Sequence, residues 1–327
     1  MNDSSALQAG RRPGPASISV VVPCYNEEEV LAELRRRLMA ALESTGIPFE
    51  IILIDDGSAD RTWEIMQQYQ HEDGRFKIIR FARNFGHQMA LTCGLDQACG
   101  EVALIIDADL QDPPELLAEM LQKWREGYEV VYGRRKQRSG ETILKRLFAY
   151  AFYRFISRVT RVNIPPDTGD FRLMGRKAID ALQSLRERHR FVRGMVSWVG
   201  FRQTPVYYDR PQRFAGTTKY PFRKSFLLAV DAITSFSHAP LRLATVLGCA
   251  ISVFAFIYIL VVLVLKFMGI NFSGYTSIMG SILLLGGVQL LVLGIIGEYI
   301  GRIYEQGKNR PLYLVSEIRG EPLKRDG

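Results

Sequence analysis

The sequence predicts an α/β protein in which a mostly parallel sheet carries helices on both faces, followed by a hairpin of two membrane-spanning helices. Between residues 17 and 132, short apolar runs alternate with segments of helical spacing. The runs are continuously apolar, as is typical of strands that are buried on both faces. After residue 240, two long stretches contain no Asp, Glu, Lys or Arg.

Predicted helices separate the predicted strands in the first half of the sequence. The helix after the first strand, for example, repeats Leu31, Leu34 and Leu38 at intervals of three and four residues. The predicted strands are 18–22, 49–54, 76–81, 102–106 and 129–132, and the predicted helices between them are 29–44, 62–70, 86–98 and 114–125. In such sheets, ligands bind beyond the carboxyl ends of the strands.

The charge-free stretches 243–265 and 275–297 predict the two spans. A helix of about 23 residues is roughly 34 Å long, which covers a hydrocarbon core of about 30 Å. A pair of buried core helices is the alternative, but a soluble helix needs polar residues on its outer face. Lys and Arg gather outside the hairpin, while its short connection holds only Lys266. We therefore expect a multi-pass protein of the inner (cytoplasmic) membrane with both termini in the cytoplasm.

The predicted organisation has five parts. They are a flexible tail at 1–16, a cytoplasmic catalytic α/β domain at 17–221, an amphipathic juxtamembrane helix at 222–242, the two transmembrane helices within 243–297, and a cytoplasmic C-terminal tail at 298–327. The first residues lack the apolar centre of a signal peptide.

Composition narrows the class of partner. Hydrophobic residues make up 47% and charged residues 23% of 327 residues, which excludes wholesale disorder. The four cysteines lack metal-ligand spacing, so we expect reduced thiols. The formal charge of +8 suits an anionic partner. With two spans present, a phosphorylated substrate and lipid are favoured over nucleic acid.

Polar residues follow three of the predicted strands. They are Tyr25, Asn26 and Glu27 after the first, Asp55 and Asp56 after the second, and Asp107, Asp109 and Gln111 after the fourth. Five carboxylates at one sheet edge repel one another, so we expect a divalent cation, Mg²⁺ or Mn²⁺, among them. A solvated turn is the alternative for Asp107 and Asp109, and a turn with a helix cap is the alternative for the segment beginning at Asp55.

Four motifs in order carry a family resemblance. They are Val-Pro-Cys-Tyr-Asn-Glu at 22–27, Asp-Asp-Gly-Ser at 55–58, Asp-Ala-Asp-Leu-Gln-Asp-Pro at 107–113 and Asp-Thr-Gly-Asp-Phe-Arg at 167–172. Together they resemble family 2 glycosyltransferases of the GT-A fold. Within that family the chain is similar to polyisoprenyl-phosphate glycosyltransferases, such as bacterial undecaprenyl-phosphate glucosyltransferases and dolichol-phosphate mannose synthase. The resemblance runs from about residue 17 through both spans.

The resemblance implies roles for the motif residues. The nucleoside positions are Pro23, Tyr25, Glu27 and Asp56, and the metal and diphosphate positions are Asp107, Asp109 and Gln111. Asp170 stands where many relatives have a small residue, which leaves open whether Asp167 or Asp170 faces the reacting centre. Processive synthases carry Gln-x-x-Arg-Trp, which this sequence lacks, so transfer of a single sugar is expected.

Basic residues supply the expected phosphate contacts. Arg134 and Arg213 are expected at the donor, and Arg134, Arg146, Arg172 and Lys219 at the acceptor phosphate, with Arg146 also expected beside Asp109 in catalysis. A solvated surface is the alternative for any one of them. Gly297 and Gly301 have the small-xxx-small spacing of helix packing, within one chain or in a homo-oligomer.

The expected enzyme is an inverting, metal-dependent glycosyltransferase. It moves one sugar, glucose from UDP-glucose in the first instance, to undecaprenyl or another polyprenyl phosphate at the cytoplasmic membrane face. The alternatives are the same acceptor with GDP-mannose, UDP-N-acetylhexosamine or UDP-aminoarabinose, and a non-catalytic membrane protein that binds a nucleotide sugar.

Overall fold

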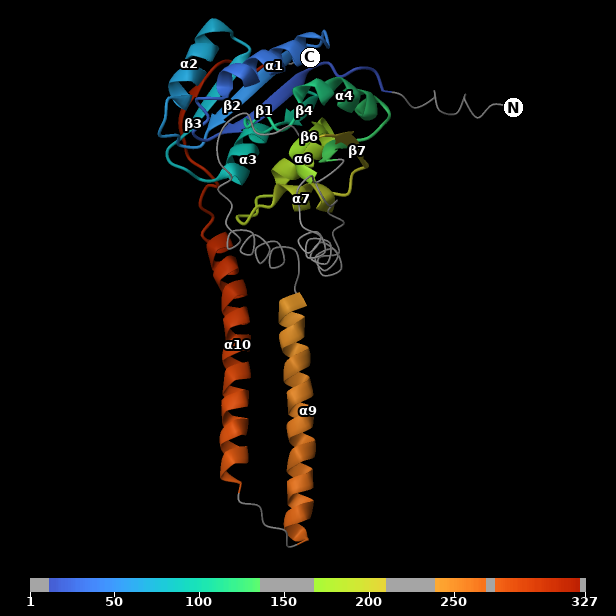
Figure 1. The fold of residues 1–327 in the computed structure, drawn as a ribbon, viewed down its shortest axis with the longest axis vertical. Coiled ribbons are helices and arrows are strands. Elements are labelled where there is room, and N and C mark those ends of the chain that lie inside the picture. The colour runs from blue at the N-terminus through green and yellow to red at the C-terminus, as the bar shows by residue number, and fades with distance from the viewer. Residues whose placement is uncertain (1–11, 136–167, 210–238, 269–273, 324–327) are drawn as a thin grey trace, which may run out of the picture. The chain divides into compact units, whose positions relative to one another are not determined.

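The computed structural model describes residues 12–135, 168–209, 239–268 and 274–323. The described chain forms two compact units, an α/β unit that includes residues from 311 onward and a helical hairpin that ends at Arg310 (Figure 1). The predicted amphipathic helix falls almost wholly outside the described residues, as does the tail up to residue 11.

One eight-stranded sheet organises the α/β unit. Its strand order is β7 (Gln203–Tyr208), β5 (Val130–Arg135), β6 (Thr168–Gly175), β4, β1, β2, β3 and β8 (Val315–Arg319). Its centre confirms the predicted parallel arrangement, because β1 pairs in parallel with both β2 and β4, and β2 pairs in parallel with β3. The strands are β1 (Ile18–Cys24), β2 (Phe49–Asp55), β3 (Phe76–Phe81) and β4 (Val102–Ile105). The helices are α1 (Leu31–Glu43), α2 (Thr62–Glu72), α3 (His87–Gln97) and α4 (Leu117–Arg125), with a 3₁₀ turn η1 (Pro114–Leu116) before α4.

Alternate residues of β1 serve the two faces of the sheet. Val20 and Val22 belong to the buried cluster that includes Leu34 of α1 and Met120 of α4. Val21 points to the other face, which α3 covers. Gly94 of α3 lies so close to the sheet that an added Cβ would be 2.2 Å from Cγ1 of Val21. The glycine therefore sets how near α3 lies to the sheet.

The remaining strands extend the sheet beyond the predicted core. β6 (Thr168–Gly175) lies antiparallel between β4 and β5 (Val130–Arg135), and β7 (Gln203–Tyr208) pairs in parallel with β5. Two helices, α6 (Arg176–Ser184) and α7 (Val192–Trp198), connect β6 to β7.

The first and the last described segments of the α/β unit both contact the rest of that unit. Arg12 belongs to the segment that the sequence predicts as a flexible tail, and it forms an ion pair of 2.6 Å with Glu129. Where the second predicted tail lies, β8 (Val315–Arg319) pairs antiparallel with β3. The chain that follows the hairpin thus returns to the sheet as an edge strand.

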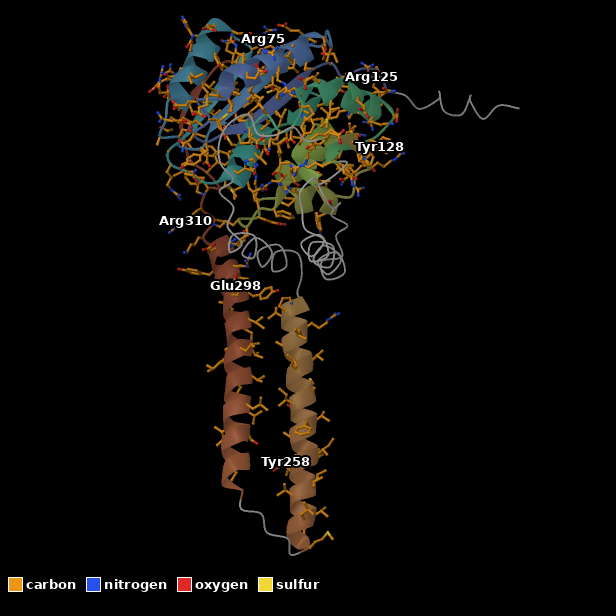
Figure 2. All side chains as sticks on the ribbon, viewed as in Figure 1. Arg75, Arg125, Tyr128, Tyr258, Glu298 and Arg310 are labelled. Atoms are coloured by element: carbon orange, nitrogen blue, oxygen red, sulfur yellow. The ribbon has the colours of Figure 1, made fainter. Side chains whose placement is uncertain are left out.

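The second unit consists of α9 (Ala239–Phe267) and α10 (Tyr275–Gly307), which contact each other as a hairpin (Figure 1). Two segments are long and apolar enough to cross a membrane, Pro240–Val262 and Gly280–Gly307, with mean hydropathies of 2.6 and 2.1. The most apolar part of each segment is exposed rather than packed inside the protein, and Ala244 near the start of the first segment is buried. Apolar side chains project along both helices (Figure 2), and Phe254 is 72% exposed. Apolar side chains that are exposed along both helices argue against buried core helices.

Candidate active site

The loops after β1 and β2 are joined side by side at the carboxyl edge of the sheet. The backbone N–H of Asn26 donates to the Ser58 hydroxyl at 3.0 Å, and the Asn26 side-chain oxygen accepts from the N–H of Ala59 at 2.8 Å. Asn26 has a φ of 55°, a left-handed value that Asn tolerates. Tyr25 is 49% exposed beside it. An exposed aromatic ring on a braced loop is a suitable surface for a planar ligand.

Pro23 and Glu27, the other residues predicted at the nucleoside, flank this loop. Pro23 lies within β1, where the pairing with β4 has already ended at Val21, so the missing N–H of proline costs no strand bond there. The N–H of Glu27 donates to the Thr62 hydroxyl at 2.8 Å, which ties the loop to the start of α2.

Asp56 binds the backbone at the start of α3. Its Oδ1 accepts from the N–H of Phe85 at 2.7 Å, and its Oδ2 accepts from the N–H of Gly86 at 2.9 Å. Burial raises the pKa of Asp56, and these two backbone donors partly offset that rise. Gly86 has φ 98° and ψ 152°, a conformation that is essentially confined to glycine. The Asp56 carboxylate and this glycine together fix where α3 begins.

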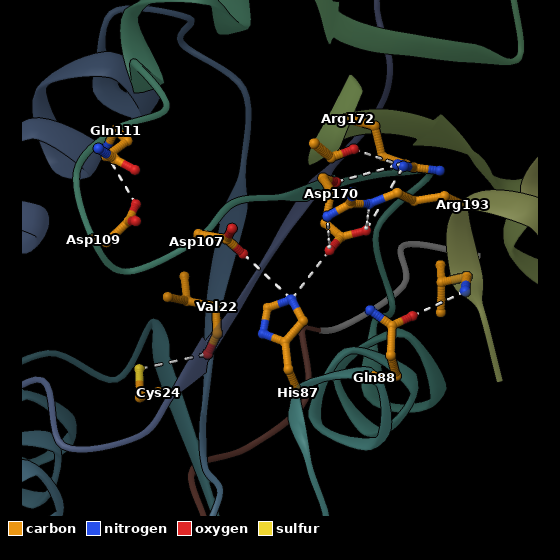
Figure 3. A network of polar contacts seen from close by, with 12 residues as sticks. Val22, Cys24, His87, Gln88, Asp107, Asp109, Gln111, Asp170, Arg172 and Arg193 are labelled. Carbon is orange, nitrogen blue, oxygen red and sulfur yellow. Dashed lines mark hydrogen bonds and ion pairs between the residues drawn. The ribbon is translucent and has the colours of Figure 1, made fainter. Parts of the chain in front are cut away.

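His87, the first residue of α3, lies between two carboxylates (Figure 3). Its Nε2 is 3.2 Å from Oδ2 of Asp170 on β6 and 3.5 Å from Oδ1 of Asp107, which follows β4. Burial alone lowers the pKa of His87, but the hydrogen bond to Asp170 and the charges of both carboxylates outweigh it, and the net shift is upward. The imidazole therefore connects the loop after β4 with β6.

Asp170 is buried and its carboxylate is held on both oxygens. Arg193 of α7 forms a bidentate pair with it, Nε to Oδ1 and Nη2 to Oδ2, both at 2.9 Å. Burial raises the pKa of Asp170, but the charge of Arg193 and the hydrogen bonds from His87 and Arg193 hold it well below its usual range. Asp170 is thus an ionised structural anion in this arrangement.

Comparison with known proteins identifies the fold and the hairpin separately. Residues 19–183 match the family glycosyl transferase family 2, and residues 239–303 match the GtrB C-terminal hairpin. The chain is 51% identical to the glycosyltransferase YkcC of Bacillus subtilis, over 94% of this chain and 95% of that one. The chain belongs to glycosyltransferase family 2. It is also 40% identical to the SfII prophage-derived bactoprenol glucosyl transferase of Shigella flexneri, over 93% of this chain and 99% of that one.

This glycosyltransferase therefore has the GT-A fold that its motifs predict, and its hairpin marks it as membrane-associated. Asp107 and Asp109 stand on the loop after β4, as the motif requires. Oδ1 of Asp109 accepts from the N–H of Gln111 at 3.2 Å, and Leu110 between them has a φ of 59°. Figure 3 shows Asp109 and Gln111 together on this loop and Asp107 nearer to His87.

The loop after β4 fits a divalent cation. Oδ1 of Asp107 is buried without a hydrogen-bond partner, and its pKa is raised to about 7 by burial, with the charges of Asp170, Asp112 and Asp109 adding to the rise and that of His87 opposing it. A positive ion would satisfy that oxygen and reverse the shift. Among the described residues no group of three or more His, Cys, Asp or Glu side chains is arranged around one point. A site with few protein ligands suits Mg²⁺ or Mn²⁺, which take further oxygens from substrate phosphates.

The predicted basic residues divide between described and undescribed segments. Arg134 lies on β5 with its guanidinium 5.8 Å from the ring centre of Tyr207. Arg172 is buried at 4% exposure, and it donates to the carbonyls of Gly169 and Asp170 rather than facing solvent. Four predicted site residues lie outside the described residues, namely Arg146, Asp167, Arg213 and Lys219.

Sequence reasoning missed His87 and Arg193. The signal for His87 was available, because a helix that begins after a parallel strand starts at the same sheet edge as the acidic loops. Arg193 had no such signal, since its position depends on β6 and α7, which the pattern of apolar residues did not reveal.

Proposed function

We propose that this glycosyltransferase moves one glucose from UDP-glucose to a polyprenyl phosphate at the cytoplasmic face of the membrane. The observation that carries the proposal is the likeness to bactoprenol glucosyl transferases, which extends over 99% of the Shigella flexneri protein and therefore includes the hairpin. The acidic loops beyond β1, β2 and β4 provide the matching donor site.

The reaction is a single displacement at the anomeric carbon of the sugar. An oxygen of the acceptor phosphate forms the new bond to that carbon, the bond to the diphosphate oxygen breaks, and UDP leaves with the electron pair, so the configuration inverts. A phosphomonoester has a second pKa of about 6, so the acceptor is already ionised at neutral pH. The reaction therefore needs no strong general base, which agrees with an Asp170 that is bound to Arg193.

The residues proposed to hold the cation are Asp107, Asp109 and Gln111. When bound, Mg²⁺ or Mn²⁺ supplies positive charge to the departing diphosphate. Asp56 and Glu27 keep the loop after β1 and the start of α3 in place, and Tyr25 offers its exposed ring to the base. Arg134, Arg146, Arg213 and Lys219 remain the proposed phosphate contacts.

The hairpin is proposed to anchor the enzyme where its lipid acceptor lies. The two candidate spans and the basic residues outside them support a cytoplasmic location of both termini, under the positive-inside rule. A cytoplasmic donor site suits a nucleotide sugar, which is made and kept in that compartment. The C-terminal segment would share the compartment, because β8 pairs with β3 of the same domain.

Transfer of radiolabelled sugar by the purified full chain tests the proposal. The donors are UDP-glucose, GDP-mannose, UDP-N-acetylglucosamine and UDP-aminoarabinose, with undecaprenyl phosphate as acceptor and with Mg²⁺, Mn²⁺ or chelator. The proposal expects transfer from UDP-glucose that chelator stops and that Asp109→Ala abolishes. Transfer from another donor alone overturns the assignment of glucose. Donor binding without any transfer favours a nucleotide-sugar-binding protein.

A further inference from the structure

His87 has two carboxylates within reach of one ring nitrogen (Figure 3). Its Nε2 is 3.2 Å from Oδ2 of Asp170 and 3.5 Å from Oδ1 of Asp107. Only the contact with Asp170 is a hydrogen bond, and within the described part of the chain the buried Oδ1 of Asp107 has no hydrogen-bond partner. The ring nitrogen therefore serves one carboxylate and leaves the other without a donor.

The direction of this hydrogen bond follows from its acceptor. An ionised carboxylate can only accept, so Nε2 of His87 carries the hydrogen in the neutral and in the charged imidazole alike. Arg193 keeps Asp170 ionised, because its Nε and Nη2 each bind one oxygen of that carboxylate at 2.9 Å. The Nε2 hydrogen thus points toward Asp170 and away from Asp107.

Asp170 is fixed in place, whereas His87 lies at the surface of the site. The side chain of Asp170 is 3% exposed and belongs to β6, between β4 and β5 of the sheet. The side chain of His87 is 42% exposed at the first position of α3. A small rotation of the imidazole would redirect its N–H, since both acceptor oxygens lie within 3.5 Å. The fixed anion on β6 therefore decides where the N–H points.

A redirected hydrogen bond would affect the residue that is proposed to hold the divalent cation. A donor on the Asp107 carboxylate would use one of its lone pairs and draw its charge toward the imidazole. A cation needs the same lone pairs and the same charge. A hydrogen bond from His87 to Asp107 would therefore compete with the metal.

We propose that Asp170 is a positioning residue that holds the N–H of His87 and so keeps the Asp107 carboxylate available to the divalent cation. Arg193 supports this role by binding both oxygens of Asp170. His87 is then neither a ligand of the metal nor a donor to Asp107 in the native protein. The proposal rests on the proposed function for the metal site, and its readout is the affinity for metal rather than transfer.

Electron paramagnetic resonance of Mn²⁺ tests the proposal on the full chain in nanodiscs, without donor or acceptor. Asp170→Asn keeps the shape of the side chain and removes its charge, so the N–H of His87 should turn to Asp107. The competing hydrogen bond to a charged group should weaken Mn²⁺ binding by about 10- to 100-fold. His87→Ala should stay within about threefold of the wild type, because Asp107 loses no hydrogen bond.

The double variant separates the redirected hydrogen bond from the loss of charge. Removal of the Asp170 charge also weakens cation binding by itself, because Arg193 beside it stays positive. That effect is the same whether or not His87 is present. We therefore expect the loss caused by Asp170→Asn to be at least about five times smaller in the His87→Ala background. An equal loss in both backgrounds overturns the proposal.

Asp73→Asn is the matched control for the removal of an arginine-bound carboxylate. Arg75 binds Asp73 through Nε and Nη2, at 3.0 and 2.7 Å, at the C-terminal end of α2. This variant should leave Mn²⁺ affinity within about twofold, because the charge is remote from the proposed site and screened. A loss as large as that of Asp170→Asn overturns the proposal.

The wild type alone gives a second measurement, which does not depend on the folding of Asp170→Asn. Pulsed resonance of bound Mn²⁺ should show no coupling to a ligating nitrogen, because Nε2 of His87 carries its hydrogen toward Asp170. A nitrogen coupling that His87→Ala removes would make His87 a ligand and overturn the proposal. So would Mn²⁺ binding that Asp107→Asn leaves unchanged. A wild type that binds Mn²⁺ as expected but transfers no glucose contradicts the proposed function alone.

Discussion

Oδ2 of Asp56 accepts a hydrogen bond of 2.9 Å from the backbone N–H of Gly86, the residue directly before α3. This bond connects the loop after β2 to His87 and, through it, to Asp107. The nucleoside end and the metal end of the predicted site therefore share one helix as a common support. A substitution at Asp56 should therefore alter both the nucleoside end and the metal end of the predicted site.

Replacement of Asp56 by alanine should lower both stability and activity. Two partly buried N–H groups, of Phe85 and Gly86, would lose their acceptor, at about 1 kcal/mol each. We expect the melting temperature of the detergent-purified chain to fall by several degrees, with kcat reduced as His87 moves. Asp56→Asn keeps one acceptor oxygen and should be milder. An unchanged melting temperature with only a raised KM for the donor would assign Asp56 to the nucleoside alone.

Insertion of one methyl group at Gly94 should displace α3. In Gly94→Ala the new Cβ would lie 2.2 Å from Cγ1 of Val21 and 2.9 Å from Cδ1 of Ile54, so the helix must shift away from the sheet. Overpacking of this kind costs about 1–3 kcal/mol. Chemical denaturation should show that loss, and transfer should fall with it. Gly74→Ala is the control, because a Cβ there meets no atom within 4 Å. Equal stability of the two variants would contradict the prediction.

The first half of the fold was predictable because its strands are continuously apolar. β1, β2 and β4 are buried along their whole length, and the acidic residues stand where these strands end. Parallel pairing then brings Asp56 and Asp107 to one edge without further information. The candidate donor and metal residues are therefore the polar residues that directly follow these strands in the sequence.

The second half was not predictable from the same pattern. β6 is a buried strand that contains the charged residues Asp170 and Arg172, so its sequence lacks the continuous apolar run that predicts a buried strand. The charge of Asp170 is tolerated there because His87 of α3 and Arg193 of α7 pair with it. β8 is a short, mostly exposed edge strand with the sequence Val-Ser-Glu-Ile-Arg, which resembles a polar tail. Both strands form through contacts between segments that are far apart in the sequence, and the spacing of residues within each strand does not predict those contacts.

Asp107→Asn should separate stability from activity. The ionised form of Asp107 is costly in the metal-free protein, because its Oδ1 is buried without a hydrogen-bond partner and other carboxylates lie nearby, and its pKa is about 7. We expect the variant to melt no lower than the wild type without metal, while transfer falls at least about 100-fold, the scale for loss of a preorganised charge. Addition of Mn²⁺ should raise the melting temperature of the wild type and leave Asp107→Asn unaffected. Equal stabilisation of both proteins by Mn²⁺ would remove Asp107 from the metal site.

The same substitution should change the pH dependence of stability. Asp107 has a folded pKa of about 7, and an unfolded Asp has a pKa of about 4. Between these values the native chain holds a proton that the unfolded chain releases, so this group makes the free energy of unfolding fall as pH rises. Metal-free melting curves from pH 4.5 to 7.5 should show that contribution in the wild type and not in Asp107→Asn. Parallel curves would contradict it.

Tyr313, six residues beyond the end of α10, should anchor the returning C-terminal segment. Its ring stacks on Phe81 of β3 with centroids 5.2 Å apart, and its hydroxyl donates to Asp96 of α3 at 2.8 Å. Tyr313→Phe removes only the hydroxyl and should cost about 1 kcal/mol, since Asp96 keeps Arg186 as a partner. Tyr313→Ala also removes the stacked ring and should cost about 3 kcal/mol or more.

Limited proteolysis of the full chain with a C-terminal epitope measures this anchoring. Release of β8 from β3 exposes the segment after Pro311, so Tyr313→Ala should lose the epitope at least about tenfold faster than the wild type, with Tyr313→Phe in between. Because α3 carries His87, a released segment should also lower kcat more than it changes the donor KM. Equal cleavage rates in all three proteins would show that the β8 pairing alone, without Tyr313, holds the chain on the sheet.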